Sequence, residues 1–254
     1  MWGIIPAAGE GKRIQPLAFS KELLPVGYKE SANKKRPRAV SDFIVERLII
    51  GGANKLCFVI SPRKGDILQY HRAGHSGSKF MYLVQPEPLG LCDAVFRPVD
   101  FIGENEEVLI GLPDTVWFPV DGYALLPSGV LSFLLFPVNS PQHFDAVLLG
   151  EENQVLRVEV KQEKPSTHWI WGAIRMPGGV FRRLYDLWVE RSRQDEYLGT
   201  LFNSWLERGN VAIGVKAGTN YLDVGTIDGL KVAFDHLMQN STPANKSQIY
   251  DDNV

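Results

Sequence analysis

The segment best suited to chemistry is a loop that directly follows the first apolar run of the chain. It reads PAAGEGKR over residues 6–13 and ends in two cations. Its small residues are Ala7, Ala8, Gly9 and Gly11. At the carboxyl end of a strand, such a loop can bring backbone N–H groups close to phosphates. It is neither a Walker A motif, because Pro6 replaces the first glycine, nor a dinucleotide fingerprint, because Ile14 replaces the third. An ordinary tight turn is the alternative interpretation.

The residues that follow this loop resemble a known signature. They read IQPLAFSKELLPV over residues 14–26. The whole stretch resembles the signature of the sugar-phosphate nucleotidyltransferases, the glucose-1-phosphate thymidylyl- and uridylyltransferases. The resemblance implies that the small-residue loop wraps the triphosphate of an incoming nucleotide, and that Arg13 and Lys21 are catalytic residues. Their chemistry agrees with this role, because fixed cations can meet charge that develops on transferred phosphorus and on leaving pyrophosphate.

A second segment resembles the loop with which this family reads the nucleotide base. Residues 84–91 read VQPEPLGL, and the resemblance assigns base recognition to the Gln85 side chain and the Gly90 backbone. A glutamine amide carries both a donor and an acceptor, as the imide edge of uracil or thymine requires. We therefore expect UTP or dTTP to be preferred over ATP. Taken alone, a glutamine beside two prolines is more often an ordinary loop.

Two aspartates resemble the family's ligands for Mg²⁺, the cofactor that the resemblance implies. Asp114 follows an apolar run, although Leu112 and Pro113 intervene where typical members have Gly-Asp. Asp223 lies in YLDVGT, which resembles the W-x-D-x-G-T/S motif of the family. A carboxylate at a strand end suits a hard cation on a triphosphate. The alternative for Asp114 is an N-cap of a following helix, and Thr226 is expected to cap the last helix.

The acceptor side of the expected site resembles the family less closely. Glu163-Lys164-Pro165 matches the family's E-K-P, whose lysine binds the phosphate of the sugar 1-phosphate, and Gly172 lies in a strand expected to line the sugar pocket. Residues 144–147 read FDAV where typical members carry Tyr-Gly. Typical members carry GExxxTD at residues 195–201, and this chain keeps the glutamate as Glu196 but lacks the later aspartate. Residues 27–35 are a polar insertion. The basic residues 29–38 in and after this insertion are interpreted as a solvated loop.

The activity that the resemblance implies is transfer of a nucleotidyl group from an NTP to a sugar 1-phosphate, with release of pyrophosphate. Two alternatives stay open. One is nucleotidyl transfer to a non-sugar phosphomonoester such as phosphocholine, because the altered residues lie on the acceptor side. The other is a non-catalytic nucleotide-sugar sensor. The predicted partners are an NTP and a sugar 1-phosphate, and a homo-oligomer is left open.

The elements that position these residues follow from hydrophobic periodicity. Short apolar runs alternate with segments of helical spacing, which is typical of βα units around a mainly parallel sheet. Strands are predicted at 2–5, 55–60, 79–85, 108–112, 145–149, 155–162, 169–176 and 211–216. Helices are predicted from Pro37 to Gly51, and at 64–72, from 91, at 180–191, 198–207 and 226–238. With the resemblance, this predicts an α/β, Rossmann-like mixed sheet flanked by helices, as a single domain over residues 1–240 with a polar tail at 241–254.

Composition sets the remaining limits. The 254 residues are 44% hydrophobic, which is enough for a sizeable core. Lys and Arg number 27 against 29 Asp and Glu, so no nucleic-acid surface is expected. No apolar run approaches the roughly 20 residues of a membrane span and no signal peptide is evident, so a cytoplasmic location without membrane contact is predicted. Cys57 and Cys92 are expected to be buried small hydrophobes.

Overall fold

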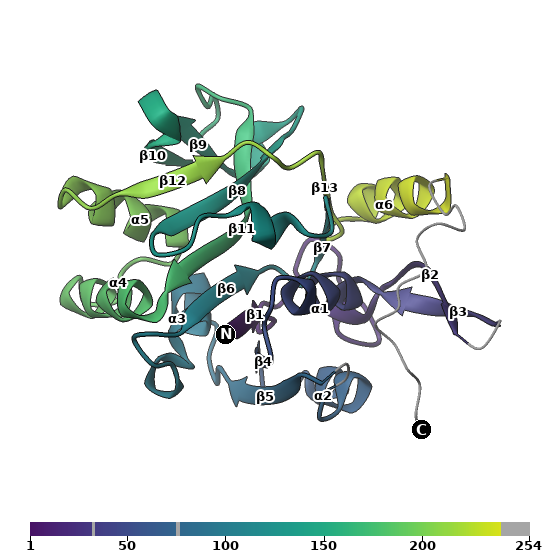
Figure 1. Ribbon diagram of the computed structural model, residues 1–254. Coiled ribbons are helices and arrows are strands. Elements are labelled where there is room, and N and C mark those ends of the chain that lie inside the picture. Colours follow the sequence, from purple (N-terminus) through teal and green to yellow (C-terminus); the bar gives the residue numbers. More distant parts are fainter. Residues whose placement is uncertain (32–33, 75–76, 240–254) are drawn as a thin grey trace.

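The protein is built around a mixed sheet with a parallel centre. The computed structural model describes residues 1–31, 34–74 and 77–239 (Figure 1). The nine-stranded sheet has the order β10-β9-β11-β6-β1-β4-β5; β8 joins it by pairing with β11, and β12 pairs with β8. Its centre consists of β1 (Trp2–Pro6), β4 (Lys55–Ile60), β5 (Lys79–Val84) and β6 (Glu107–Gly111), which pair in parallel. Helices cover both faces, which confirms the predicted α/β, Rossmann-like class.

The helices of the first half connect the parallel strands. They are α1 (Val40–Ile50), α2 (Gly65–His71) and α3 (Gly90–Phe96). The prediction that the first helix begins near Pro37 is wrong, because Pro37 lies in a strand that pairs with Tyr28. The helix instead begins at Val40, where Asp42 Oδ2 accepts the N–H of Ala39 at 3.2 Å. It ends before Gly51, as the sequence predicts.

The second half continues the same sheet. Its elements are β8 (Leu131–Pro137), β9 (Asp145–Leu149), β10 (Val155–Val160), β11 (Trp169–Pro177), α4 (Gly178–Glu190), α5 (Leu198–Glu207), β12 (Ala212–Val215) and α6 (Ile227–Gln239). Strand β11 pairs antiparallel with β6 and joins the two halves. Short 3-10 turns lie at Lys21–Leu23, Val99–Phe101, Gly122–Leu125, Pro141–His143 and Glu151–Asn153. Strand β8 was not predicted, although it is apolar apart from Ser132 and buried along nearly its whole length.

A small second sheet brings distant parts of the chain together. Strands β7 (Thr115–Phe118) and β13 (Asn220–Asp223) pair antiparallel, with Thr115 opposite Asp223. The alternative that Asp114 caps a following helix is therefore wrong, because a strand follows. Thr226 does cap the last helix, since its Oγ1 accepts the N–H of Gly229 at 3.1 Å. The antiparallel register places Asp114 and Asp223 at the same end of this sheet.

The polar insertion forms a hairpin rather than the solvated loop that the sequence suggested. Strands β2 (Pro25–Ser31) and β3 (Lys34–Ala39) pair antiparallel, and the hairpin extends away from the main sheet beside α6 (Figure 1). Its base packs into a small core that includes Val26, Val224 and Ala233. A two-stranded ribbon of polar residues can form where one end packs against apolar neighbours.

Three further expectations concern the chain as a whole. Cys57 and Cys92 are both buried, as predicted. Within the ranges described, no helix is long and apolar enough to cross a membrane. The predicted tail at 241–254 lies outside the described residues.

Candidate active site

The small-residue loop after β1 offers a row of unused backbone N–H groups. The Ala7 amide still belongs to the sheet, because it donates to Val59 O at 2.7 Å. From Ala8 to Arg13, no backbone N–H donates a hydrogen bond to any described residue. Gly11 has a φ of +66°, and a Cβ there would lie 2.7 Å from Lys21 Cδ. Glycine therefore permits both the turn and the close passage of the Lys21 stem.

The carbonyl side of this loop is held by Lys64, a residue that sequence analysis did not single out. Its Nζ donates to Ala7 O and Gly9 O, both at 2.7 Å, and to the two carboxylate oxygens of Glu22 at 2.7 and 2.9 Å. Burial lowers the pKa of Lys64 and raises that of Glu22, against their mutual attraction. The pair fixes the loop from inside, so that its carbonyl groups face Lys64 and its unused amides remain for a ligand.

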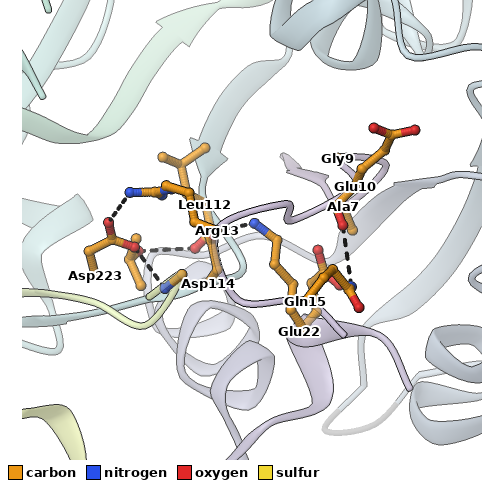
Figure 2. A network of polar contacts seen from close by, with 12 residues as sticks. Ala7, Gly9, Glu10, Arg13, Gln15, Glu22, Leu112, Asp114 and Asp223 are labelled. Carbon is orange, nitrogen blue, oxygen red and sulfur yellow. Dashed lines mark hydrogen bonds and ion pairs between the residues drawn. The ribbon is translucent and has the colours of Figure 1, made fainter. Parts of the chain in front are cut away.

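The predicted catalytic cations are paired with the predicted metal ligands. Lys21 Nζ lies 2.5 Å from Asp114 Oδ2, and Arg13 Nη1 lies 3.2 Å from Asp223 Oδ2. Figure 2 shows Arg13, Asp114 and Asp223 gathered beside one another. Burial opposes charge on Lys21, but Asp114 outweighs it and the pKa of Lys21 is raised. Burial also opposes charge on Asp114, and Lys21 nevertheless lowers its pKa. The Lys21–Asp114 pair is thus charged at neutral pH.

The two carboxylates face a shared gap beside Gly225. A Cβ on Gly225 would lie 2.9 Å from Asp223 Oδ1, 3.0 Å from Arg13 Nη2 and 3.4 Å from Asp114 Oδ2. Glycine at this position therefore keeps open the space into which three charged groups point. Nowhere in the described ranges do three or more acidic, histidine or cysteine side chains form a cluster able to hold a metal. A cation between Asp114 and Asp223 would need further oxygens from a ligand or from water, which is the usual way in which Mg²⁺ is held on phosphates.

The predicted base-reading residues are fixed by an internal network. Gln85 follows β5, and its Nε2 donates to Asp93 Oδ2 at 2.8 Å and to Gly90 O at 3.0 Å. Both partners are acceptors, so the amide is oriented with its nitrogen toward them. Gln85 Oε1 receives no hydrogen bond from the described residues. Gly90 has a φ of +91°, and a Cβ there would lie 2.9 Å from Glu196 O. The arrangement presents Gln85 as a pure acceptor.

The residues predicted for the acceptor lie on the far half of the sheet. Glu163 and Lys164 are exposed in the connection between β10 and β11. Gly172 is buried at an irregularity of β11, where a Cβ would lie 2.5 Å from the ring of Tyr221 and 2.6 Å from that of Phe136. Gly172 is therefore required by packing. The binding roles of all three residues remain predictions.

Comparison with known proteins places the chain in a family. A family model described as nucleotidyl transferase matches residues 2–240 of the chain. The chain belongs to the nucleotidyl transferase family. This membership confirms the resemblance that the sequence motifs carry.

Individual relatives agree over most of the chain. It is 31% identical over 255 residues to the glucose-1-phosphate thymidylyltransferase of Mycolicibacterium smegmatis, covering 92% of this chain and 81% of the relative. A Bacillus anthracis protein in complex with sucrose has a TM-score of 0.76 at 23% identity, covering 92% of this chain and 94% of that one. The UTP-bound UGPase of Acinetobacter baumannii has a TM-score of 0.73 at 16% identity, covering 92% of each chain. These two structures show the same fold.

In this nucleotidyl transferase, Lys64 and Glu22 are the site residues that sequence reasoning missed. One signal for Lys64 was present, since a lysine directly before the first residue of α2 opposes the helix dipole and needs a compensating partner. Its partner Glu22 stands 42 positions away, and no periodicity connects the two.

Proposed function

We propose that this nucleotidyl transferase joins an NTP, with UTP or dTTP preferred, to a sugar 1-phosphate, forming an NDP-sugar and pyrophosphate. One observation carries the proposal: a loop of unused amides, two fixed cations and two carboxylates converge at the carboxyl ends of β1 and β6. An enzyme that moves a nucleotidyl group needs all three kinds of group around a triphosphate. The name of the Mycolicibacterium smegmatis relative supports a sugar 1-phosphate as the acceptor.

In the proposed reaction, a phosphate oxygen of the sugar 1-phosphate attacks the α-phosphorus of the NTP in line. The new P–O bond forms as the bond to the bridging oxygen breaks, and that oxygen leaves with pyrophosphate. The amides of residues 8–13 bind the triphosphate, while Arg13 and Lys21 stabilise the charge that develops during transfer. Lys164 holds the attacking phosphate. No covalent intermediate on the protein is required.

Mg²⁺ is the proposed cofactor, and the residues present fit it. Asp114 and Asp223 supply hard oxygen ligands from two different strand ends, and the gap beside Gly225 separates them. When bound, the ion would hold the triphosphate oxygens and draw charge away from the reacting phosphorus. The two aspartates also orient the neighbouring cations, through the ion pairs with Lys21 and Arg13.

The orientation of Gln85 supports the proposed choice of base. Uracil and thymine carry an N3–H donor, which the Gln85 Oε1 acceptor matches. Adenine and cytosine present an unprotonated ring nitrogen at the corresponding edge, and two facing acceptors repel each other. Guanine keeps an N1–H, so its exclusion depends on its larger size. The preference for UTP or dTTP therefore has a physical basis in the contacts with Asp93 and Gly90.

The deciding experiment is a pyrophosphate-release screen with Mg²⁺ present. Each NTP is paired with a panel of sugar 1-phosphates and with other phosphomonoesters, including phosphocholine. We expect release only with UTP or dTTP and a sugar 1-phosphate. The proposal would be refuted if phosphocholine were the only acceptor that supports pyrophosphate release, or if no combination of NTP and acceptor released pyrophosphate.

Two variants of the same loop provide a matched control for this screen. Arg13→Ala should lower kcat/KM by about 100- to 1000-fold, the usual cost of removing one group that stabilises a developing anion. Lys12→Ala removes a neighbouring cation whose side chain is 86% exposed and which pairs only with Glu10 among the described residues. We expect it to change kcat/KM by less than about twofold. Equal losses in both variants would indicate a general charge effect rather than a role for Arg13.

A further inference from the structure

The connection between β10 and β11, which carries Lys164, has no regular structure of its own. Residues 161–168 form neither helix nor strand. Between Gln162 and Thr167, the backbone N–H of Ser166 is the only one that donates a hydrogen bond to another described residue. Without that contact, nothing described in the structure would fix the backbone on which Lys164 stands.

Glu159 of β10 supplies the contact. Its Oε2 accepts the Ser166 N–H at 2.7 Å, and its Oε1 accepts the Ser166 hydroxyl at 2.8 Å. Glu159 lies opposite Ala146, which in turn lies opposite Ile170, so the three side chains share one face of the sheet. Ala146 and Ile170 belong to the core, and Glu159 is only 8% exposed. The connection is therefore held by a side chain that is itself fixed in the sheet.

The burial of Glu159 is not explained by stability alone. Within the described ranges, it forms no ion pair with a lysine, an arginine or a histidine. A carboxylate that is buried away from cations costs free energy, and an apolar side chain at the same place would not. What the carboxyl group does provide is two acceptor oxygens, which match the N–H and the O–H of one serine.

Pro165 passes the position of Ser166 on to Lys164. It is the only residue between the two. The proline ring fixes its own φ near about −65° and restricts the preceding residue to extended conformations. The backbone of Lys164 therefore has few conformations once Ser166 is held. Lys164 itself is exposed, so a phosphate can reach its ammonium group.

The same arrangement recurs beside Lys21, in a different part of the fold. Asp66, at the start of α2, accepts the Ser20 N–H at 2.7 Å and the Ser20 hydroxyl at 2.6 Å. Ser20 directly precedes Lys21, and its carbonyl accepts the N–H of Leu23 at 2.9 Å in the 3-10 turn. Asp66 also forms no ion pair with any described residue. Two separate segments thus use a carboxyl group and a serine to fix the backbone beside a lysine.

We propose that Glu159 is a positioning residue for Lys164, and that Asp66 is a positioning residue for Lys21. The inference rests on the proposed function, in which these lysines meet the acceptor phosphate and the triphosphate. Neither carboxyl group touches a substrate, because each acts through the neighbouring serine. A lysine whose backbone is already ordered binds phosphate without the entropy cost of ordering its loop. In-line attack also tolerates little displacement of the reacting phosphates.

The test measures kcat and both KM values in Glu159→Met and Asp66→Ala, with the best NTP and sugar 1-phosphate of the screen. Glu159→Met keeps the length of the side chain and removes both acceptors. It should raise the KM for the sugar 1-phosphate about tenfold and the KM for NTP less than about twofold. Asp66→Ala should instead lower kcat about tenfold, because Lys21 acts on charge that develops during transfer, with the KM for the sugar 1-phosphate nearly unchanged. A general loss of stability would affect both variants alike.

The decisive readout is whether Glu159 acts through Lys164. In a Lys164→Ala background, Glu159→Met should raise the KM for the sugar 1-phosphate by less than about twofold, because the lysine that it positions is gone. A full tenfold effect in that background would overturn the inference.

Two milder variants keep the test valid if Glu159→Met does not fold. Glu159→Gln can still accept the Ser166 N–H and can donate to the Ser166 hydroxyl, so its KM for the sugar 1-phosphate should stay within about twofold of the wild type. Ser166→Ala, at an exposed position, removes one of the two hydrogen bonds and should raise that KM about threefold. A loss in Glu159→Gln as large as that in Glu159→Met would contradict a role based on hydrogen bonds to Ser166.

The outcomes also separate the inference from the function on which it rests. If the wild type is active but Glu159→Met and Ser166→Ala both keep the wild-type KM values, the inference fails and the proposed function stands. If Lys164→Ala leaves the KM for the sugar 1-phosphate unchanged, the role of Lys164 fails together with the inference. If the wild type releases no pyrophosphate with any sugar 1-phosphate, the proposed function itself fails.

Discussion

Replacing Lys64 by methionine should destabilise the protein far more than a surface charge change. The substitution leaves Glu22, which is 1% exposed, without its cation, and it removes the donor to two carbonyl groups of the loop after β1. Breaking a buried charge pair from one side costs about 3 to 5 kcal/mol. For a chain of this size, that corresponds to a fall of about 6 to 20 °C in the Tm.

The assay is urea unfolding of Lys64→Met, with two reference variants. Lys55→Met breaks a partly exposed pair with Glu106, so it should cost less than about 1 kcal/mol. Lys64→Met combined with Glu22→Gln removes the unpaired charge and should recover at least half of the loss. The reasoning is refuted if Lys64→Met costs less than about 1 kcal/mol, or if the double variant is less stable than the single one.

The pH dependence of this deficit gives an independent check. Burial already raises the pKa of Glu22 above 4.5, and removal of Lys64 should raise it further. A group with a raised pKa in the folded state gains stability from protonation. The deficit of Lys64→Met should therefore be full at pH 7 and shrink as the pH falls toward 4.5. A deficit that grows on acidification would contradict the assignment of an unpaired Glu22.

Four further predictions concern ligands and pH. Asp114→Asn and Asp223→Asn should each lower kcat more than about 100-fold with the fold intact, as should EDTA; unchanged rates in the chelator would contradict the metal assignment. Lys164→Ala should weaken sugar 1-phosphate binding about ten- to a hundredfold by calorimetry, with NTP affinity retained. Gln85→Ala should abolish the preference for UTP or dTTP over ATP in competition binding. Hydrogen bonds from Lys55 and from neighbouring groups lower the pKa of Glu106 to about 2, so its stabilisation is present above pH 4.5 and lost as the pH falls toward 2; Glu106→Gln should remove that part of the acid dependence.

The sequence was sufficient for the elements whose pattern is local. Strand Lys55–Ile60 and helix Leu198–Glu207 have the predicted bounds, because a buried parallel strand is a short apolar run and an amphipathic helix shows its spacing. Arg13, Lys21, Asp114 and Asp223 were chosen from motifs spread over the whole chain, and the structure brings these side chains together.

What the sequence could not provide depends on partners that are distant in the chain. Strands Thr115–Phe118 and Asn220–Asp223 have only four residues each, too few for periodicity, and each exists because the other pairs with it. The hairpin at Pro25–Ala39 carries polar residues that are typical of loops, and its base is fixed by packing against α6. Phe144-Asp145 was visible as a departure, but only the fold reveals that α5 packs over the carboxyl group of Asp145.

The two ion pairs beside Gly225 have a thermodynamic consequence. A triphosphate that binds Arg13 or Lys21 would leave the paired aspartate without its cation. A divalent cation that binds Asp114 or Asp223 would leave the paired lysine or arginine without its carboxylate. Either ligand alone leaves an uncompensated charge behind, and Asp114 and Lys21 are mostly buried. When both ligands bind, Arg13 and Lys21 exchange a carboxylate for a phosphate, and Asp114 and Asp223 exchange a cationic side chain for the metal. No charge is then left uncompensated. We therefore expect nucleotide and metal to bind with positive cooperativity, each raising the affinity for the other by the same factor, so that a metal–nucleotide complex binds more tightly than either component.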